Sequence, residues 1–252
     1  MATQSVEFAN VSFTLPGGRQ LLSDVSLTID AGTTTALLGR SGSGKTTLLR
    51  MVNALVRPTS GSVVVGGRDV ATVDEIELRR GIGYVIQETG LFPHMTISEN
   101  VGLPLDLGRK LSRGMDEYWE RVAAALDKVG LPLKEFGDRY PWLLSGGQKQ
   151  RAGVARALVN DPTVLLMDEP FGALDPLTRA EIQTMLRELL RRVGVTTLIV
   201  THDLDEGLYL ADRIVLLEAG RVVADLPSAE FRASPNEDVR KYVAATHRGG
   251  AV

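Results

Sequence analysis

TALLGRSGSGKT, residues 35–46, is the stretch that decides the fold of this chain. Thr35 to Leu38 has the composition of a short buried strand, a glycine-rich segment follows, and an apolar helix is expected from Thr47 to Leu55. Glycines let successive backbone N–H groups turn inward around phosphate oxygens, and the helix adds its positive N-terminal end. Lys45 can reach the β- and γ-phosphates, and the Thr46 hydroxyl can ligate Mg²⁺. The stretch therefore predicts a nucleotide-binding loop, with contacts from Gly39, Arg40, Ser41, Gly42, Ser43, Gly44, Lys45, Thr46 and Thr47.

Strands and helices alternate around this loop. Val25, Leu27 and Ile29 alternate with polar residues, which predicts a half-buried strand, and the turn at residues 16–18 makes residues 6–30 antiparallel. Strands followed by crossover helices imply a mainly parallel sheet that is covered on both faces. The further elements expected are strands at 82–86, 164–167 and 196–200 and a helix with an apolar face from Ile182 to Val193.

The middle of the chain has helical periodicity and no convincing strand, from about Ile97 to Ala157. Thr96 and Glu99 have capping-box spacing and are expected to open the first of its helices. A helix and a frayed end are expected in the tail, from Ser228 to Val252. We therefore predict one domain over 1–252, with an α/β core at about 1–88 and 158–225, a helical subdomain at about 89–157, and a helical tail at about 226–252.

Composition excludes several classes of function. The 252 residues carry a net charge of −3, contain no Cys and only three His, and are 5% aromatic. Disulfide frameworks, Cys-based zinc sites and thiol catalysis are excluded, and neither the charge nor the aromatic content is typical of a nucleic-acid binder. The N-terminus is not a signal peptide, and the longest apolar runs are far too short to span a membrane. We expect a soluble chain that other chains would have to hold at a membrane.

A second chemical element is the apolar run Val164–Met167, which ends in the carboxylates Asp168 and Glu169. A carboxylate at such a strand end can hold Mg²⁺ beside a phosphate loop. The second carboxylate is then free to polarise a water for attack on the γ-phosphate. The pair predicts hydrolysis as well as binding of the nucleotide.

The most discriminating element is the sequence LSGGQ, Leu144 to Gln148. Ser145 and Gln148 have the spacing of a helix cap, and Gly146 and Gly147 leave the helix N-terminus open to an anion. One loop already covers one face of the triphosphate, so a second anion-binding helix end cannot easily reach the same nucleotide within one chain. The economical interpretation is that LSGGQ contacts ATP that is held by another copy.

These motifs together resemble the nucleotide-binding subunit of an ABC transporter, over roughly Val6 to Val243. The family fold is a P-loop NTPase α/β core with a mainly parallel sheet, an N-terminal antiparallel β subdomain and an inserted helical signature subdomain. The resemblance assigns Walker A to Gly39–Thr46, Walker B to Val164–Asp168, the catalytic glutamate to Glu169, the signature to Leu144–Gln148, the Q-loop to Gln87, the D-loop to Ala173–Asp175 and the switch histidine to His202.

The resemblance implies roles that the residues alone leave open. Gln87 would sense Mg²⁺ and the attacking water, whereas by itself it reads as an exposed loop residue. His202 would contact the γ-phosphate, although it could equally be structural, and Asp175 would line the interface between two copies, although it could simply cap a helix before Pro176. Two copies would enclose two ATP molecules head to tail, with Thr46, Gln87 and Asp168 at Mg²⁺ and with Lys45, Gln87, Glu169 and His202 in hydrolysis. The contacts from the second copy would be Ser145, Gly146, Gly147, Gln148 and Asp175.

The resemblance also bears on the partners. A separate integral membrane permease is implied, for which Phe92 to Thr96 is a candidate docking surface, with a substrate-binding protein acting indirectly and no nucleic acid. The implied location is the cytoplasmic side of the cell membrane. Several stretches look most like importers of glycine betaine, choline and related osmoprotectants, whereas methionine, sulfate or polyamine import stays open. Chromosome-structural ATPases are disfavoured because residues 46–144 hold no sustained heptads, and small-molecule kinases because LSGGQ is present.

One departure from the family concerns the base of the nucleotide. Leu15 aligns where an aromatic residue that stacks on adenine is usual, and Phe13 lies two residues earlier, on the same face if both belong to a strand. The favoured interpretation is that Phe13 is core and that Leu15 offers a smaller apolar contact to the base. Both residues stay candidate contacts of the ATP base, and we expect weak discrimination between ATP and GTP.

Overall fold

The computed structural model describes residues 3–87, 89–108, 111–172 and 174–248. The chain divides into two compact units, one made of residues 80–193 and the other of residues up to 79 together with residues from 194 onward. Each unit is described by itself. Among the described residues, none of the helices combines the length and apolar character needed to cross a lipid bilayer.

An antiparallel sheet of order β2-β1-β4-β5 forms part of the second unit. Strand β1 pairs with β2 and with β4, and the turn at residues 16–18 joins β1 to β2 as expected. Val25, Leu27 and Ile29 of β2 are buried, so the alternation in the sequence marks the core face of this strand. The bounds are β1 Val6–Thr14, β2 Gln20–Ile29, β4 Ser60–Val65 and β5 Arg68–Asp69.

A second group of strands carries the nucleotide loop of the same unit. Strand β3 is parallel to both β8 and β9, and β10 is antiparallel to β9. Every residue of β3 and β8 is buried, as expected for strands covered on both faces. The bounds are β3 Thr34–Leu38, β8 Thr196–Val200, β9 Arg213–Glu218 and β10 Arg221–Pro227, with helices α1 Lys45–Val52, α2 Glu75–Arg80, α8 Leu204–Leu210, α9 Ser228–Phe231 and α10 Glu237–Arg248.

Two helix boundaries differ from the sequence expectation. Helix α1 begins at Lys45, two residues earlier than expected, and ends at Val52. It ends early because Ala54 adopts a left-handed φ of 55°, which does not continue a helix. The tail forms two helices, α9 and α10, where one was expected, and Pro235 lies in the segment between them. The frayed end that we expected after the tail helix falls on residues 249–252, outside the described residues.

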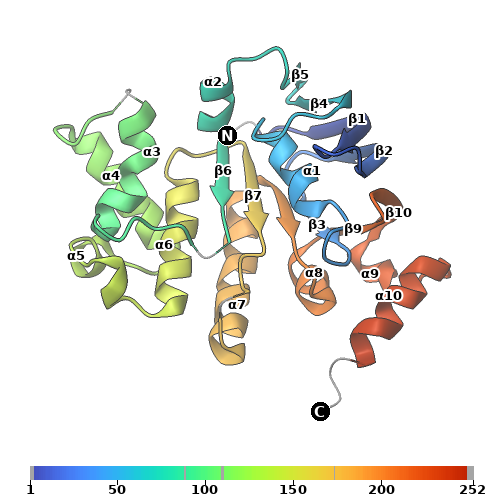
Figure 1. The fold of residues 1–252 in the computed structure, drawn as a ribbon. Helices are drawn as coiled ribbons and strands as arrows, with labels where there is room; N and C mark the ends of the chain where they lie inside the picture. The colour runs from blue at the N-terminus through green and yellow to red at the C-terminus, as the bar shows by residue number, and fades with distance from the viewer. Residues whose placement is uncertain (1–2, 88, 109–110, 173, 249–252) are drawn as a thin grey trace. The chain divides into compact units, whose positions relative to one another are not determined.

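The first unit combines two parallel strands with most of the helices. Strands β6 Ile82–Val85 and β7 Val164–Asp168 lie side by side (Figure 1). The sequence from 97 to 157 is helical and contains no strand among its described residues, as predicted. Thr96 and Glu99 form the predicted capping box through bonds between each side chain and the other residue's amide. The helices are α3 Ile97–Gly108, α4 Asp116–Lys128, α5 Leu133–Phe136, the 3₁₀ helix η1 Pro141–Leu143, α6 Gly146–Leu158 and α7 Pro176–Val193.

The α/β fold class is thus confirmed, with an antiparallel sheet, mostly parallel further strands and an inserted helical stretch. The compact units divide at 79/80 and 193/194, whereas the predicted subdomains divide where helices replace strands. The subdomain boundaries at about 88 and 157 stay a prediction.

Candidate functional site

The nucleotide loop, Gly39 to Gly44, leaves the buried end of β3 through backbone conformations that require glycine. Gly39 has a φ of 149°, and a Cβ atom there would lie 2.2 Å from the carbonyl oxygen of Leu217. Gly44 has a φ of 102°, and a Cβ atom there would lie 2.5 Å from Leu22. Larger side chains at either position would force the loop open. Steric crowding and backbone conformation therefore explain why glycine stands at each end of the loop.

Lys45, the first residue of α1, is buried and bent back over the loop. Its Nζ donates hydrogen bonds to the carbonyl oxygens of Gly39 at 2.8 Å and of Arg40 at 3.0 Å. An ammonium group in this position is aimed into the space that the loop encloses. The structure thus places Lys45 where the sequence motif predicts the cation.

Two features show that the loop fits an anionic group. The Oγ of Ser43 is buried and has no hydrogen-bond partner among the described residues, which is costly unless a ligand supplies one. Gly44 precedes α1 without a side-chain cap, so the positive end of the helix faces the loop without a protein anion. A phosphate group would satisfy both. Thr46 and Thr47 follow as half-buried residues of the first turn.

His202 lies at the same sheet edge as the loop. Strands β3 and β8 are parallel, so their carboxyl ends meet there, and the amide of Thr201 donates to the carbonyl of Leu37. The His202 side chain is exposed, and Asp203 caps the helix that follows. The second unit therefore brings Lys45, Thr46 and His202 to one edge of its strands.

Carboxylates gather at the corresponding edge of the first unit. Strand β7 ends at Asp168, which is buried and accepts a hydrogen bond from Tyr84 at 3.4 Å. The next residue, Glu169, adopts a left-handed φ of 44°. A non-glycine residue there is strained by about 1–3 kcal/mol, and such strain clusters at functional sites. Strand β6 is parallel to β7, so Gln87, exposed just after β6, lies at the same edge.

Among the described residues, no cluster of three or more acidic or histidine side chains could hold a metal ion by itself. A hard cation such as Mg²⁺ typically completes its coordination with substrate phosphates and water, so one or two protein ligands suffice. In the second unit Thr46 offers a hydroxyl oxygen, and in the first unit Asp168 offers carboxylate oxygens. Each is a donor of the kind that Mg²⁺ prefers.

The segment after Gln87 is held by a half-buried arginine that sequence reasoning missed. Arg156, on α6, donates to the carbonyl oxygens of Thr89 at 2.8 Å and Gly90 at 2.7 Å. Both acceptor residues have left-handed φ angles, 62° and 55°. Burial lowers the pKa of the Arg156 guanidinium. The available signal was an arginine among apolar residues, Val154 to Leu158, on the packed side of a predicted helix.

The LSGGQ sequence forms the N-terminus of α6 with the predicted cap. Ser145 Oγ accepts from the Gln148 amide at 3.2 Å, and Gln148 Oε1 accepts from the Ser145 amide at 3.0 Å. Ser145 and Gly146 are exposed, whereas Gly147 is buried, with Thr178 of α7 within 2.6 Å of where its Cβ would lie. The exposed side of this helix end is available to an anion.

Asp175 caps α7, as its own sequence context suggested. Its Oδ1 accepts from the amide of Thr178 at 3.1 Å, and these hydrogen bonds from Thr178 hold the pKa of the carboxyl below its usual range. The side chain is exposed, so capping leaves it accessible to a second copy. Ala173, which belongs to the same predicted motif, lies outside the described residues.

The two candidate base contacts do not lie on one strand face, so that expectation is wrong. Phe13 lies in β1 opposite Leu22, next to register shifts in the pairing. Leu15 follows the end of β1 and closes a turn, because its amide donates to Arg19 and its carbonyl accepts from Gly18. Both side chains are half-buried.

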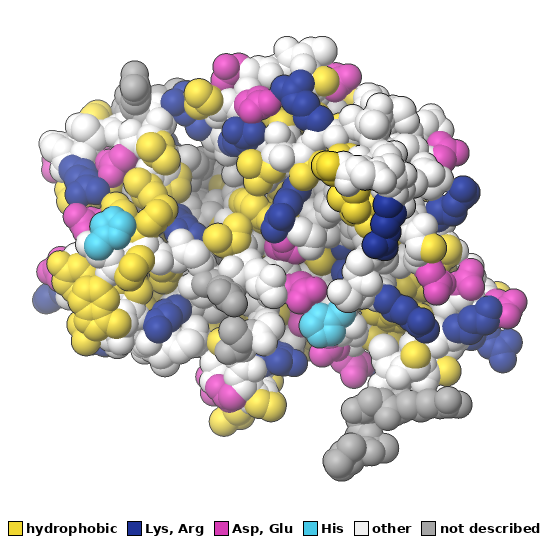
Figure 2. Space-filling view, in the orientation of Figure 1, with side chains coloured by type: hydrophobic (Ala, Val, Ile, Leu, Met, Phe, Trp, Pro, Cys, Tyr) yellow, Lys and Arg dark blue, Asp and Glu magenta, His cyan; other side chains and the backbone are white. Residues whose placement is uncertain are grey.

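Apolar and aromatic side chains form an exposed surface on the first unit, which we call the aromatic surface. Phe92 is 43% exposed, and Trp142 and Leu143 are each 60% exposed. Tyr140 stacks on Trp142 with ring centroids 4.4 Å apart, and the Phe92 ring contacts the edge of His94. The segment after Phe92 is joined to the segment before Tyr140 by two backbone hydrogen bonds. The amide of Ile97 donates to the carbonyl of Arg139, and the amide of Ser98 donates to the carbonyl of Gly137. Apolar side chains gather over the region of α5 (Figure 2). The sequence predicted Phe92 to Thr96 as a docking surface and missed Tyr140 to Leu143.

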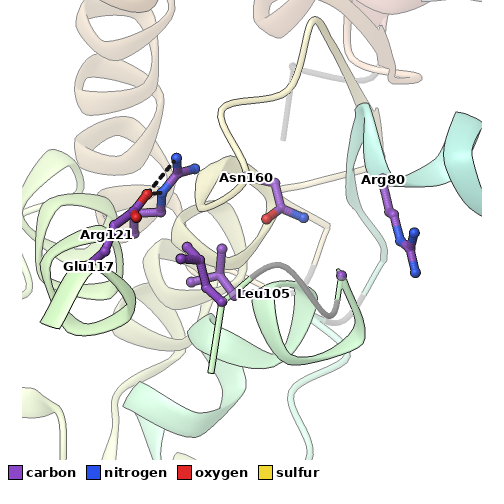
Figure 3. Close-up of a pocket in the computed structure, with 7 residues that line it drawn as sticks. Arg80, Leu105, Glu117, Arg121 and Asn160 are labelled. Carbon is purple, nitrogen blue, oxygen red and sulfur yellow. Dashed lines mark hydrogen bonds and ion pairs between the residues drawn. The ribbon is translucent and has the colours of Figure 1, made fainter. Parts of the chain in front are cut away.

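A cavity of about 400 Å³ in the first unit contains none of the predicted site residues. Its two arginines are engaged, since Arg121 pairs with Glu117 at 3.2 Å (Figure 3) and Arg80 donates to the carbonyl of Leu107 at 3.0 Å. Leu105 and Asn160 complete much of the lining. This cavity is not a candidate nucleotide site.

Comparison with known proteins places the motifs in a family. The family profile described as ABC transporter matches residues 22–172. The carnitine transport ATP-binding protein OpuCA of Listeria monocytogenes is 44% identical over 239 residues, which cover 94% of this chain and 59% of that protein. The glycine betaine uptake system ATP-binding protein YehX of Escherichia coli is 42% identical over 97% of this chain and 78% of that protein. The chain spans about three-fifths of the length of the first of these relatives.

A solved structure has the same fold. The dimeric ATP-binding cassette MJ0796, in a post-hydrolysis state bound to ADP and phosphate, matches with a TM-score of 0.77 and 34% identity. The match covers 88% of this chain and 98% of that one.

Proposed function

This chain belongs to the ABC transporter family, and on that premise we propose that it binds and hydrolyses ATP to power a separate membrane permease. The observation that carries the proposal is the nucleotide loop, in which buried Lys45 lies beside a Ser43 hydroxyl that has no hydrogen-bond partner among the described residues, an arrangement that a phosphate would complete. The relatives with similar sequences are named as ATP-binding proteins of carnitine and glycine betaine transport. We therefore assign this chain to the uptake of quaternary amine osmoprotectants.

Each residue near the phosphates has a distinct role. Lys45 and the amides of the loop stabilise charge on the phosphates, with the loop pre-shaped by its glycines. Thr46, Asp168 and Gln87 would hold Mg²⁺, which would neutralise negative charge on the phosphates. Glu169 orients a water molecule and accepts its proton. His202 contacts the γ-phosphate.

Two copies of the chain complete each site. The exposed Ser145 and Gly146, at the open end of α6, contact the ATP that lies on the loop of the other copy, and Gly147, Gln148 and Asp175 line the same interface. The MJ0796 cassette with similar sequence and fold is described as dimeric with ADP and phosphate. Hydrolysis removes the charge that bridges the copies, so the pair opens and closes with each turnover.

The aromatic surface is where the permease docks. Its exposed Phe92, Trp142 and Leu143 are the kind of side chains that anchor a protein interface. Arg156 of α6 is hydrogen-bonded to the carbonyls of Thr89 and Gly90, which directly precede the Phe92 part of this surface. Movement of the signature helix α6 therefore reaches the docking surface through these two carbonyls. The chain then works at the cytoplasmic face of the membrane, with an extracytoplasmic binding protein that delivers substrate to the permease.

Substitution of Glu169 tests the proposed function. Glu169→Gln removes the base but leaves the loop intact, so we expect ATP binding to persist, turnover to be lost and a dimer to accumulate with ATP. Phosphate release and size-exclusion chromatography measure these outcomes. Glu181→Gln, which changes an exposed glutamate of α7, is the control and keeps the parental rate. A Glu169→Gln variant that hydrolyses ATP at the parental rate would sink the assignment.

The permease that co-purifies with the chain tests the transported solute. Uptake of labelled glycine betaine by vesicles that contain the complex should require ATP inside and should fail with Glu169→Gln. Uptake of methionine, sulfate or a polyamine in its place would contradict the osmoprotectant assignment and leave the ATPase assignment standing.

A further inference from the structure

The C-terminal helix α10 reaches the nucleotide loop through one side chain, Tyr242. Its ring packs against a buried cluster that contains Leu38 and Leu204. Leu38 is the last residue of β3 and directly precedes Gly39, and Leu204 is the first residue of α8, two residues after His202. Tyr242 therefore lies against the two elements that carry the loop and the switch histidine.

The phenol oxygen makes a polar contact with the turn that carries His202. It donates a hydrogen bond to the carbonyl oxygen of His202 at 3.1 Å. Burial raises the pKa of the Tyr242 phenol, so the group is neutral and keeps its donor proton at physiological pH. A single hydroxyl thus ties helix α10 to the peptide that follows His202.

The helix that carries Tyr242 is itself fixed. Asn236 caps α10 through the amides of Asp238 and Val239, and its side-chain amide donates to the carbonyl of Val223 in β10 at 3.0 Å. Val239 is buried in the same cluster as Leu38. Since the helix is held at its start and along its apolar face, the position of the phenol is determined by packing.

We propose that Tyr242 is a positioning residue of the nucleotide site, which holds the turn that carries His202 in place from helix α10. The inference rests on the proposed ATPase function. Without the hydroxyl, the carbonyl oxygen of His202 loses the hydrogen bond from Tyr242. The turn that carries His202 then samples other conformations. The imidazole then spends less time where the γ-phosphate needs it, whereas the loop, which supplies most of the binding, is unchanged. Turnover should fall more than affinity.

Tyr242→Phe tests this, because it removes the hydroxyl and keeps the ring. We expect kcat to fall about threefold to tenfold, as for loss of one neutral hydrogen bond, with KM for ATP within about twofold and an unchanged thermal unfolding midpoint. Thr246→Val is the matched control, since it deletes a hydroxyl of the same helix whose hydrogen bonds among the described residues go to the carbonyls of Tyr242 and Val243. It should leave kcat unchanged.

A measurement that needs no hydrolysis separates this inference from the ATPase proposal. The chain contains three histidines, so the NMR signal of the His202 ring can be assigned by its loss in His202→Gln. Tyr242→Phe should shift that signal, and Thr246→Val should not. If Tyr242→Phe leaves both kcat and the His202 signal unchanged, or if Thr246→Val has an equal effect, the positioning role is overturned. If the unsubstituted chain does not hydrolyse ATP, the proposed ATPase function is refuted. The NMR comparison would still show whether the Tyr242 hydroxyl positions the His202 ring.

Discussion

The Nζ of Lys45 lies 2.8 Å from the carbonyl oxygen of Gly39, to which it donates a hydrogen bond across the nucleotide loop. The first residue of the helix is thereby tied to the first residue of the loop. The ammonium group is held in place before any phosphate arrives, so little side-chain freedom remains to be lost on binding.

Replacement of Lys45 by methionine should weaken ATP binding by about tenfold to a hundredfold, because charge-assisted hydrogen bonds are worth about 1.5–3 kcal/mol. Isothermal titration with Mg-ATP measures the change. Lys134→Met, which changes an exposed lysine of α5, is the control and should bind as the parent does. Parental affinity in the Lys45→Met variant would mean that the loop does not hold the phosphates.

Replacement of Arg156 by glutamine should lower the free energy of unfolding by about 2–4 kcal/mol, because the carbonyl oxygens of two half-buried residues lose a charged donor. Urea denaturation measures this, and hydrogen exchange should show faster opening at residues 87–91. Arg191→Gln, at an exposed position in α7, should change the free energy of unfolding by less than about 0.5 kcal/mol. Equal stability of the two variants would show that Arg156 does not hold the Gln87 segment.

The missing aromatic residue at position 15 should make the site tolerant of the base. An aromatic stack contributes about 1 kcal/mol, so without it we expect affinities for ATP and GTP within about tenfold of each other. Leu15→Tyr should tighten ATP binding more than Phe13→Leu weakens it. Titration of both nucleotides against the three chains checks this. A larger effect from Phe13→Leu would identify Phe13 as the platform for the base.

Local features of the fold were predictable from the sequence, and contacts between distant residues were not. The loop from Gly39 to Thr46, the capping box at Ser145 and the helix cap at Asp175 each depend on residues only a few positions apart. Spacing in the sequence therefore determines them.

The contacts that reasoning missed join segments far apart in the chain. Arg156 bonds to residues 66 and 67 positions away, and Tyr242 bonds to His202 40 positions away. No periodicity reports such pairs, because tertiary packing creates them. The stacking of Tyr140 on Trp142 was missed because neither residue belongs to a strongly periodic helix. The roles of Gln87, Ser145 and His202 at ATP stay predictions.

The central claim, that two copies complete each ATP site, is open to a direct cross-linking measurement. The chain contains no cysteine, so introduced thiols are the only ones. Chains with Ser41→Cys, in the exposed part of the loop, are mixed with differently tagged chains with Ser145→Cys and treated with a short bismaleimide. Ser112→Cys, at another exposed serine of the same unit as Ser145, replaces Ser145→Cys in the control.

The account predicts a covalent pair of the two tagged chains that forms with a non-hydrolysable ATP analogue and Mg²⁺, forms poorly without nucleotide, and is absent from the Ser112→Cys control. A chain that carries both Ser41→Cys and Ser145→Cys should likewise form cross-linked dimers. Cross-linking within single chains, or no nucleotide-dependent cross-link between Ser41→Cys and Ser145→Cys chains, would contradict a site shared between two copies.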